Sequence, residues 1–195
     1  MRPPQISTDR FVLRLAEPPD VPQLVTYRRE NAGHLEPFEP TPSPELVREA
    51  WWERQVEADR RQFDAGQAVR LYLFDLGRPA PVLGLVAFSN IIRGPFQSCF
   101  LGFALAEREQ GKGLMTEAVR LGIDYMFHEQ HLHRISANHL PHNTRSAAVL
   151  KRLGFAVDGY ARDYLQIDGR WQDHILTSLV DPAWTPLPAG TPDQA

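Results

Sequence analysis

The stretch that decides the fold is residues 101–115, which has the sequence Leu101-Gly102-Phe103-Ala104-Leu105-Ala106-Glu107-Arg108-Glu109-Gln110-Gly111-Lys112-Gly113-Leu114-Met115. Its first part ends a strand predicted over 97–105, and its last part begins a helix, because apolar residues from Leu114 to Met126 recur at helical spacing. The loop between them, with Gly111 and Gly113, can turn backbone N–H groups toward an anion at the positive end of the helix. A tight strand-to-helix turn without a ligand would use the same residues, so this stretch alone leaves both interpretations open.

Two familiar phosphate-binding loops are excluded at this position. A dinucleotide-binding fingerprint needs a third glycine three residues after Gly113, where Thr116 stands. A P-loop needs four residues between its glycines, followed by Lys and Ser or Thr, and Gly111 and Gly113 do not have that spacing.

Working outward, the pattern predicts strands and helices in the order β-α-α-β-β-β-α-β-α-β-β. Strands are expected at 11–15, 69–76, 82–92, 97–105, 133–138 and 155–160, with 164–167 and 170–180 flanking a hairpin turn at Asp168-Gly169. Helices are expected from Asp20, as a capping residue, to about Asn31, over 45–65, from Leu114, and from Asn143 to Leu153. This order predicts an α/β fold, with parallel strands before and after the central helix, in a mixed, mostly antiparallel sheet of about seven strands flanked by about four helices.

Composition limits the class of protein. The chain has 195 residues, of which 43% are hydrophobic and 23% charged, which suits one domain, expected over 1–186 with a Pro-rich tail at 187–195. A net charge of −3 excludes a broad polybasic surface, so no direct nucleic-acid binding is expected. The longest apolar run, 82–88, is far shorter than a membrane span, and Cys99, the single cysteine, cannot form an internal disulfide. We therefore expect a soluble, cytoplasmic protein with no membrane partner.

A second motif lies about thirty residues after the glycine loop. Asn143-Thr144-Arg145-Ser146 begins a helix that ends before Gly154-Phe155, and a helix N-cap role alone would explain Asn143. Together with Arg108-x-x-Gly111-x-Gly113, however, this segment resembles the acetyl-CoA-binding pattern of the GCN5-related N-acetyltransferase superfamily. Residues 35–40, 110–115, 141–143 and 163–169 are similar to the RimJ/RimL group of that superfamily, and 181–186 favour its RimJ side.

This resemblance implies roles for named residues toward acetyl-CoA as cosubstrate. The strand that contains Phe103, Ala104 and Leu105 would pair through its backbone with the pantetheine arm. The loop from Arg108 to Gly113 would hold the pyrophosphate, with the N–H groups of Gln110, Gly111, Lys112, Gly113 and Leu114 as donors. Asn143 would hydrogen-bond near the thiol end, and the strands ending at Leu105 and starting at His133 would splay to form the reaction slot.

The implied reaction is direct attack of an amine on a thioester, which needs neither a metal nor a nucleophilic cysteine. Many superfamily members carry a Tyr seven residues after the helix-opening Asn as proton donor to the thiolate, and here Leu150 stands there. Ser146 is then the nearest hydroxyl, with hydrogen bonding to the helix backbone as its alternative role. Asp163 is the candidate base, with a solvated charge at a strand end as its alternative. The histidines around His128 lack zincin spacing, so no metal site is expected.

The resemblance also implies an acceptor, the N-terminal alanine of a ribosomal protein such as S5. A protein α-amine has a pKa of about 7.7–8.0, compared with about 10.4 for Lys, so a mild base suffices. Two alternatives stay open: an acetyltransferase for a small-molecule amine, and a ribosome-assembly factor that retains the fold. A monomer or a homodimer is expected.

Overall fold

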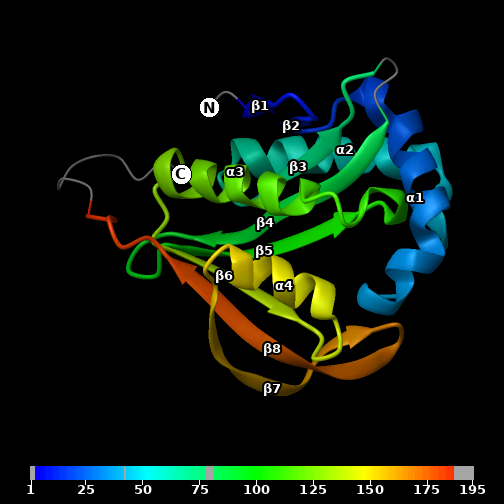
Figure 1. The fold of residues 1–195 in the computed structure, drawn as a ribbon. Helices are drawn as coiled ribbons and strands as arrows, with labels where there is room; N and C mark the ends of the chain where they lie inside the picture. Colours follow the sequence, from blue (N-terminus) through cyan, green and yellow to red (C-terminus); the bar gives the residue numbers. More distant parts are fainter. Residues whose placement is uncertain (1–2, 42, 78–80, 187–195) are drawn as a thin grey trace.

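The structure is a computed structural model that describes residues 3–41, 43–77 and 81–186 (Figure 1). The predicted tail at 187–195 lies outside the described residues. Short 3-10 helices cover Pro18–Asp20, Glu36–Phe38, Pro44–Val47 and Glu107–Glu109. The longer elements, in chain order, are β1 (Gln5–Ser7), β2 (Val12–Arg14), α1 (Val21–Leu35), α2 (Glu49–Asp64), β3 (Val69–Phe74), β4 (Val82–Ile92), β5 (Ser98–Leu105), α3 (Leu114–His128), β6 (Arg134–His139), α4 (Thr144–Arg152), β7 (Ala156–Ile167) and β8 (Arg170–Val180).

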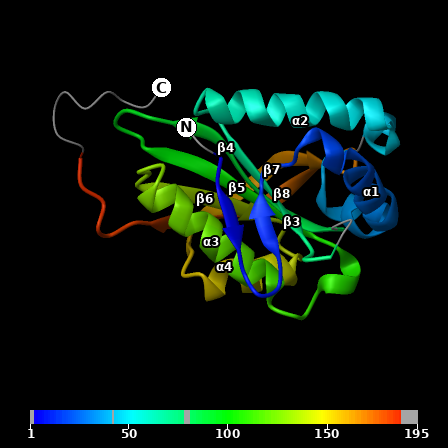
Figure 2. The same ribbon diagram turned by 90° about the horizontal axis from the view of Figure 1, so that it is seen from above.

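The strands form one mixed sheet in the order β1-β2-β3-β4-β5-β6-β8-β7. Only the β5–β6 pair is parallel, which confirms the prediction for the strands on either side of the central helix. Helices cover both faces: α2 lies on one side of the strands and α3 on the other (Figure 2). One buried core cluster joins the sheet mainly to α3 and α4, and a second joins it to α1 and α2.

The feature that creates a site is the divergence of β5 and β6. Their pairing runs from Ser98 with Arg134 to Leu101 with Ala137 and then ends, although β5 continues to Leu105 and β6 to His139. Beyond Leu101, β5 keeps its other neighbour, β4, but has no strand on the β6 side among the described residues. The predicted splay is therefore present (Figure 1).

Three details differ from the sequence-based predictions. The sheet has eight strands rather than about seven, because the short strand β1, which has no apolar run, pairs with β2. The segments 155–160 and 164–167 form one strand, β7, whose register against β8 shifts between Ala161 and Leu165. Asp20 stands at the N-cap of α1 but makes no side-chain capping bond there; its carboxylate accepts from the Glu17 N–H at 2.7 Å and pairs with Arg14 at 2.7 Å.

Two turn predictions are confirmed by backbone geometry. Gly154 follows α4 with a φ of 87°, the left-handed conformation that ends many helices. Asp168 and Gly169, with φ of 46° and 71°, connect β7 and β8 as a two-residue hairpin.

Candidate functional site

A cavity of about 1190 Å³ occupies the space where β5 and β6 diverge. Its walls come from the end of α1 and the following loop, the second half of β5, the glycine loop, α3, the end of β6, α4 and the β7–β8 hairpin. This volume exceeds that of an ordinary small-molecule pocket, which is about 300–1,000 Å³. It suits a long ligand that crosses from one face of the sheet to the other.

The glycine loop forms one wall of this cavity. Gly111 and Gly113 both have a φ of 75°, and Gly113 is the N-cap of α3. A Cβ built on either glycine would meet no atom within 4 Å, so the space beside them is open. The first amides of α3 have no acceptor within the helix, which leaves them to a ligand or to water. The loop therefore presents N–H groups and a helix N-terminus to the cavity, as predicted for an anion site.

Eight of the ten predicted cofactor-binding residues line the cavity: Phe103, Ala104, Leu105, Gln110, Gly111, Gly113, Leu114 and Asn143. Arg108 and Lys112 do not. Arg108 pairs with Glu30 at 3.3 Å, and the Nζ atom of Lys112 pairs with Glu109 at 3.0 Å. Their side chains therefore serve ion pairs around the loop.

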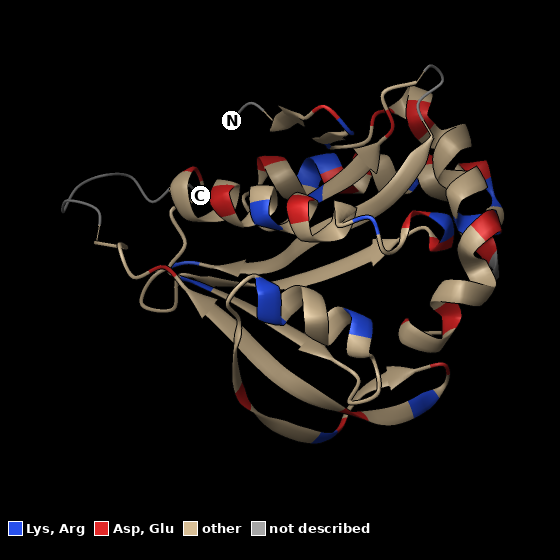
Figure 3. Cartoon of the chain, viewed as in Figure 1, with Lys and Arg blue, Asp and Glu red and all other residues tan. Residues whose placement is uncertain are grey.

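The cavity holds basic residues that the sequence analysis did not single out. Arg120 of α3 and Arg145 and Arg152 of α4 line it, and none has an acidic partner among the described residues. Figure 3 shows basic residues on both helices. The seven-residue spacing of Arg145 and Arg152, two helical turns, is the sequence signal that could have placed them on one face of α4.

The two carboxylates in the cavity wall, Glu39 and Glu117, are both paired with arginines outside it. Glu117 lies 2.8 Å from Arg10, and Glu39 pairs with the buried Arg28. Because these acids are neutralised and the three lining arginines are not, the cavity attracts anions.

Asn143 and Ser146 lie together at the start of α4, in the cavity wall. The Ser146 N–H donates to Oδ1 of Asn143 at 3.1 Å, so Asn143 is the N-cap of this helix. This bond uses the carbonyl oxygen of the Asn143 amide and leaves its NH₂ group to donate elsewhere. The structural and the ligand-binding interpretations of Asn143 are therefore compatible.

Asp163 is not brought to the cavity. It is exposed, has a φ of 45° and sits where the register of β7 shifts. Its backbone N–H donates to Oδ1 of Asp173 at 2.8 Å. The Tyr160 hydroxyl donates to the same carboxylate at 2.5 Å, and these two bonds hold the pKa of Asp173 below its usual value. In the structure, Asp163 therefore contributes its backbone N–H to the β7–β8 hairpin, and its side chain faces solvent.

Two buried histidines, which the sequence analysis did not single out, line the cavity instead. His139 ends β6, and its Nδ1 atom lies 2.9 Å from the Leu140 carbonyl; His174 is on β8, and its Nδ1 atom lies 3.0 Å from the Gln172 carbonyl. A carbonyl oxygen can only accept, so each Nδ1 carries the proton, and in the neutral ring each Nε2 is a base. No local motif marks either residue, because their role depends on strand pairing.

The single cysteine, Cys99, is buried in the core. Burial raises the pKa of the Cys99 thiol to about 12, so it stays protonated and behaves as a core side chain. No group of three or more His, Cys, Asp or Glu residues that could hold a metal occurs among the described residues. Over the same residues, none of the helices combines the length and apolar character needed to cross a membrane.

The sheet opens between β5 and β6, and the cavity there is lined by backbone amides and arginines. This arrangement is typical of a protein that binds a long anionic ligand along the free edge of a strand. Residues 10–156 match the family model described as the acetyltransferase (GNAT) domain. The chain belongs to this family and is an N-acetyltransferase.

Similar proteins match more than nine-tenths of this chain. The "[Ribosomal protein uS5]-alanine N-acetyltransferase" of Escherichia coli (strain K12) is 43% identical over 182 residues, 93% of each chain. The crystal structure of ribosomal-protein-S5-alanine acetyltransferase from Vibrio fischeri superposes with a TM-score of 0.90 at 36% identity, over 94% of this chain and 100% of that one. Mycobacterium smegmatis RimJ in complex with CoA-disulfide gives 0.84 at 27% identity, over 92% and 90%.

Proposed function

We propose that this enzyme transfers the acetyl group of acetyl-CoA to the N-terminal α-amine of a ribosomal protein, with alanine as the acceptor residue and uS5 as the protein. The observation that carries the proposal is the 43% identity to the Escherichia coli enzyme over 93% of both chains. The end of α1, the loop after it and the β7–β8 hairpin line the cavity opposite the glycine loop, where an acceptor would enter.

The cavity chemistry supports acetyl-CoA as the cosubstrate. The pyrophosphate would lie on the amides of Gln110 to Leu114, and the arginines of α3 and α4 would face the remaining phosphate charge. The free edge of β5, with Phe103, Ala104 and Leu105, offers backbone groups to the amides of the pantetheine arm. Arg108 and Lys112 would act through their backbone groups, because their side chains form ion pairs with Glu30 and Glu109.

The reaction would proceed by direct attack in a ternary complex. The amine nitrogen bonds to the thioester carbonyl carbon, the carbon–sulfur bond breaks, and CoA leaves as a thiolate that takes up a proton. Ser146 lies in the cavity wall three residues after Asn143, which makes it the candidate partner of that thiolate. The resemblance also implied Asp163 as the base. That role stays a prediction, because Asp163 does not line the cavity.

The acceptor is tested by comparing three amines at one pH. An N-terminal Ala peptide should be acetylated at least about tenfold faster at pH 7 than the same peptide with a blocked N-terminus and a free Lys, because only the α-amine is partly neutral there. The assay measures acetyl-CoA turnover, with a polyamine as the third acceptor. Preference for the Lys peptide would reject the N-terminal proposal, and preference for the polyamine would favour a small-molecule substrate.

Absence of turnover with every amine, despite acetyl-CoA binding, would favour the ribosome-assembly factor. A ribosomal acceptor would place the enzyme in the cytoplasm, where acetyl-CoA and ribosomes are both available.

A further inference from the structure

We infer that His174 is the base that takes the proton from the acceptor amine. This inference rests on the proposed acetyl transfer and goes beyond it by assigning a catalytic group that no local motif marks. The evidence is the placement of His174 in the cavity wall, the state of its ring nitrogens and the face of the sheet on which it lies.

The imidazole of His174 is held at the cavity wall. His174 is only 3% exposed, yet it lines the cavity, so its accessible part faces that space. The bond from Nδ1 to the Gln172 carbonyl places the lone pair of the neutral ring on Nε2. The ring of Tyr164 packs against the imidazole, with centroids 5.6 Å apart. The imidazole is therefore oriented before a substrate arrives, as a general base requires.

His139 and His174 lie on opposite faces of the sheet. In the β6–β8 pair, Ile175 lies opposite His139, so their side chains share one face, and His174, the residue before Ile175, points to the other face. His139 alternates with Ile135 and Ala137, which pack in the core cluster with α3. His174 therefore faces the side covered by α1 and α2, opposite the glycine loop and α4. Acetyl-CoA held on the α3 side would present its thioester through the splay to an amine on the His174 side.

Four other titratable residues lie around this part of the cavity: His34 on α1, Glu39 in the loop after it, Tyr164 on β7 and Asp173 next to His174 on β8. Glu39 is paired with Arg28, and Asp173 accepts from Tyr160 and Asp163. Nε2 of His34 accepts from the side-chain amide of Gln110 at 2.8 Å. Among the described residues of this face, His174 is therefore the imidazole that offers an unengaged Nε2 to the cavity.

The acceptor amine reacts in its neutral form, after its ammonium proton has gone to solvent. Its nitrogen bonds to the thioester carbonyl carbon, and Nε2 of His174 takes one of the two protons left on that nitrogen. The carbon–sulfur bond then breaks, CoA leaves as the thiolate, and the thiolate takes up one proton from solvent. His174 then returns its proton to solvent, so each turnover yields an amide, a thiol and one released proton.

The test is the pH dependence of kcat/KM for the N-terminal Ala peptide. Because a neutral α-amine, whose ordinary pKa is about 8, and a base with a free lone pair are both needed, log kcat/KM on the acid side should rise with pH at a slope of about 2 in the wild type. His174→Asn keeps a donor near the Gln172 carbonyl but removes Nε2. We expect a slope of about 1 and at least about 100-fold lower kcat at pH 7, with unchanged acetyl-CoA affinity.

His128→Asn is the matched control. His128 also donates from Nδ1 to a backbone carbonyl, that of Asp124 at 2.8 Å, but it is exposed at the end of α3 and outside the cavity. It should keep the wild-type slope and rate. Asp163→Asn completes the comparison and should also keep a slope of about 2.

Three results would overturn the inference: a wild-type slope of about 1, a slope of about 2 in His174→Asn, or a slope of about 1 in Asp163→Asn alone. If His174→Asn does not bind acetyl-CoA, His174→Gln and the wild-type slope decide instead. If the wild type acetylates only a small-molecule amine, the proposed acceptor is wrong, and the same slopes measured with that amine still test His174.

Discussion

Gly113→Trp should weaken acetyl-CoA binding by at least about 100-fold, while Gly94→Trp should leave it unchanged. Both glycines have a positive φ, 75° and 67°, and a Cβ on either would meet no atom within 4 Å. Each substitution therefore carries the same backbone penalty, about 1 kcal/mol or more. Only Gly113 opens into the cavity, where an indole would take the place of the pyrophosphate.

Calorimetric titration with acetyl-CoA checks this prediction, with thermal unfolding as the check on folding. The difference between the two variants isolates ligand exclusion from backbone strain, because Gly94 lies in the turn between β4 and β5 and outside the cavity wall. Near-normal binding by folded Gly113→Trp would show that the glycine loop does not hold the phosphates.

Replacing the three cavity arginines with Gln, in the variant Arg120→Gln/Arg145→Gln/Arg152→Gln, should weaken acetyl-CoA binding by at least about 100-fold. A hydrogen bond to a charged group contributes about 1.5–3 kcal/mol, so two lost phosphate contacts would account for this. These arginines have no acidic partner among the described residues, so their removal leaves no protein carboxylate unpaired.

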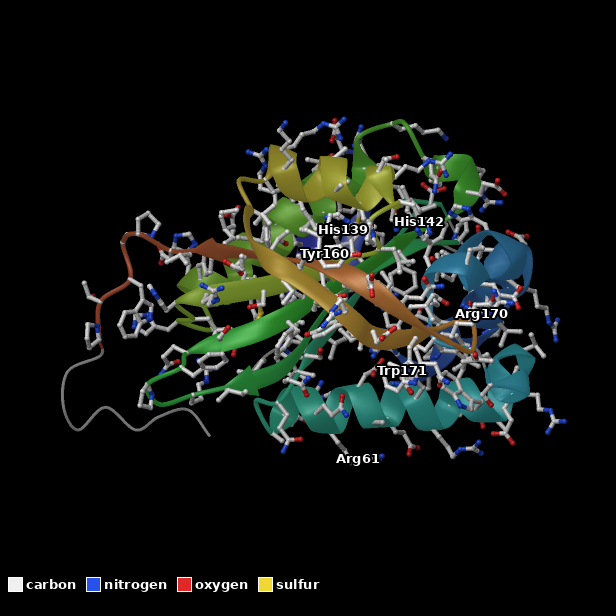
Figure 4. All side chains as sticks on the ribbon, turned by 90° about the horizontal axis from the view of Figure 1, so that it is seen from below. Arg61, His139, His142, Tyr160, Arg170 and Trp171 are labelled. Atoms are coloured by element: carbon white, nitrogen blue, oxygen red, sulfur yellow. The ribbon has the colours of Figure 1, made fainter. Side chains whose placement is uncertain are left out.

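The matched control removes the same charge from α2. Arg54, Arg60 and Arg61 are more than half exposed and lie outside the cavity, and Figure 4 shows Arg61 pointing away from the molecule. Their Gln variant should bind acetyl-CoA within about twofold of the wild type at moderate salt, because solvent and ions screen distant charges. Equal weakening in both variants would assign the effect to net charge and not to the cavity.

The glycine loop and the start of α4 could be predicted because their signals are local. Gly111 and Gly113 adopt positive φ where the chain turns into a helix, and Asn143 caps the helix that it precedes. A glycine turn and a helix cap each depend on the types of a few neighbouring residues, so both can be predicted from the sequence alone. The hairpin at Asp168-Gly169 was predicted for the same reason.

The residues that the sequence analysis missed or misplaced depend on tertiary structure. His174 reaches the cavity because β8 pairs with β6, a contact between segments more than thirty residues apart. Arg120 and Arg152 become cavity residues only when α3 and α4 are set on the same face of the sheet. Asp163 was predicted beside the slot from the resemblance, but the register shift in β7 places it on the exposed side of the hairpin. In each case strand pairing or helix packing, and not residue type, decides which side chains face the cavity.

Strand pairing within the sheet was predictable for β5 and β6 but not for the edge strand β1. The parallel β5–β6 pair followed from the strand–helix–strand order, but β1 is three residues long and is defined by its pairing with β2. Its sequence, Gln5-Ile6-Ser7, has one apolar residue and no periodicity to detect.

If the enzyme acetylates a protein α-amine, the acetyl group should be found at one position on full-length ribosomal protein uS5 that begins with alanine. After incubation with the enzyme and acetyl-CoA, tandem mass spectrometry should find one acetyl group, on the nitrogen of the N-terminal alanine, and none with the Gly113→Trp variant. Acetylation confined to lysine side chains, or an unmodified uS5 in the presence of an enzyme that turns over another amine, would contradict the proposed function.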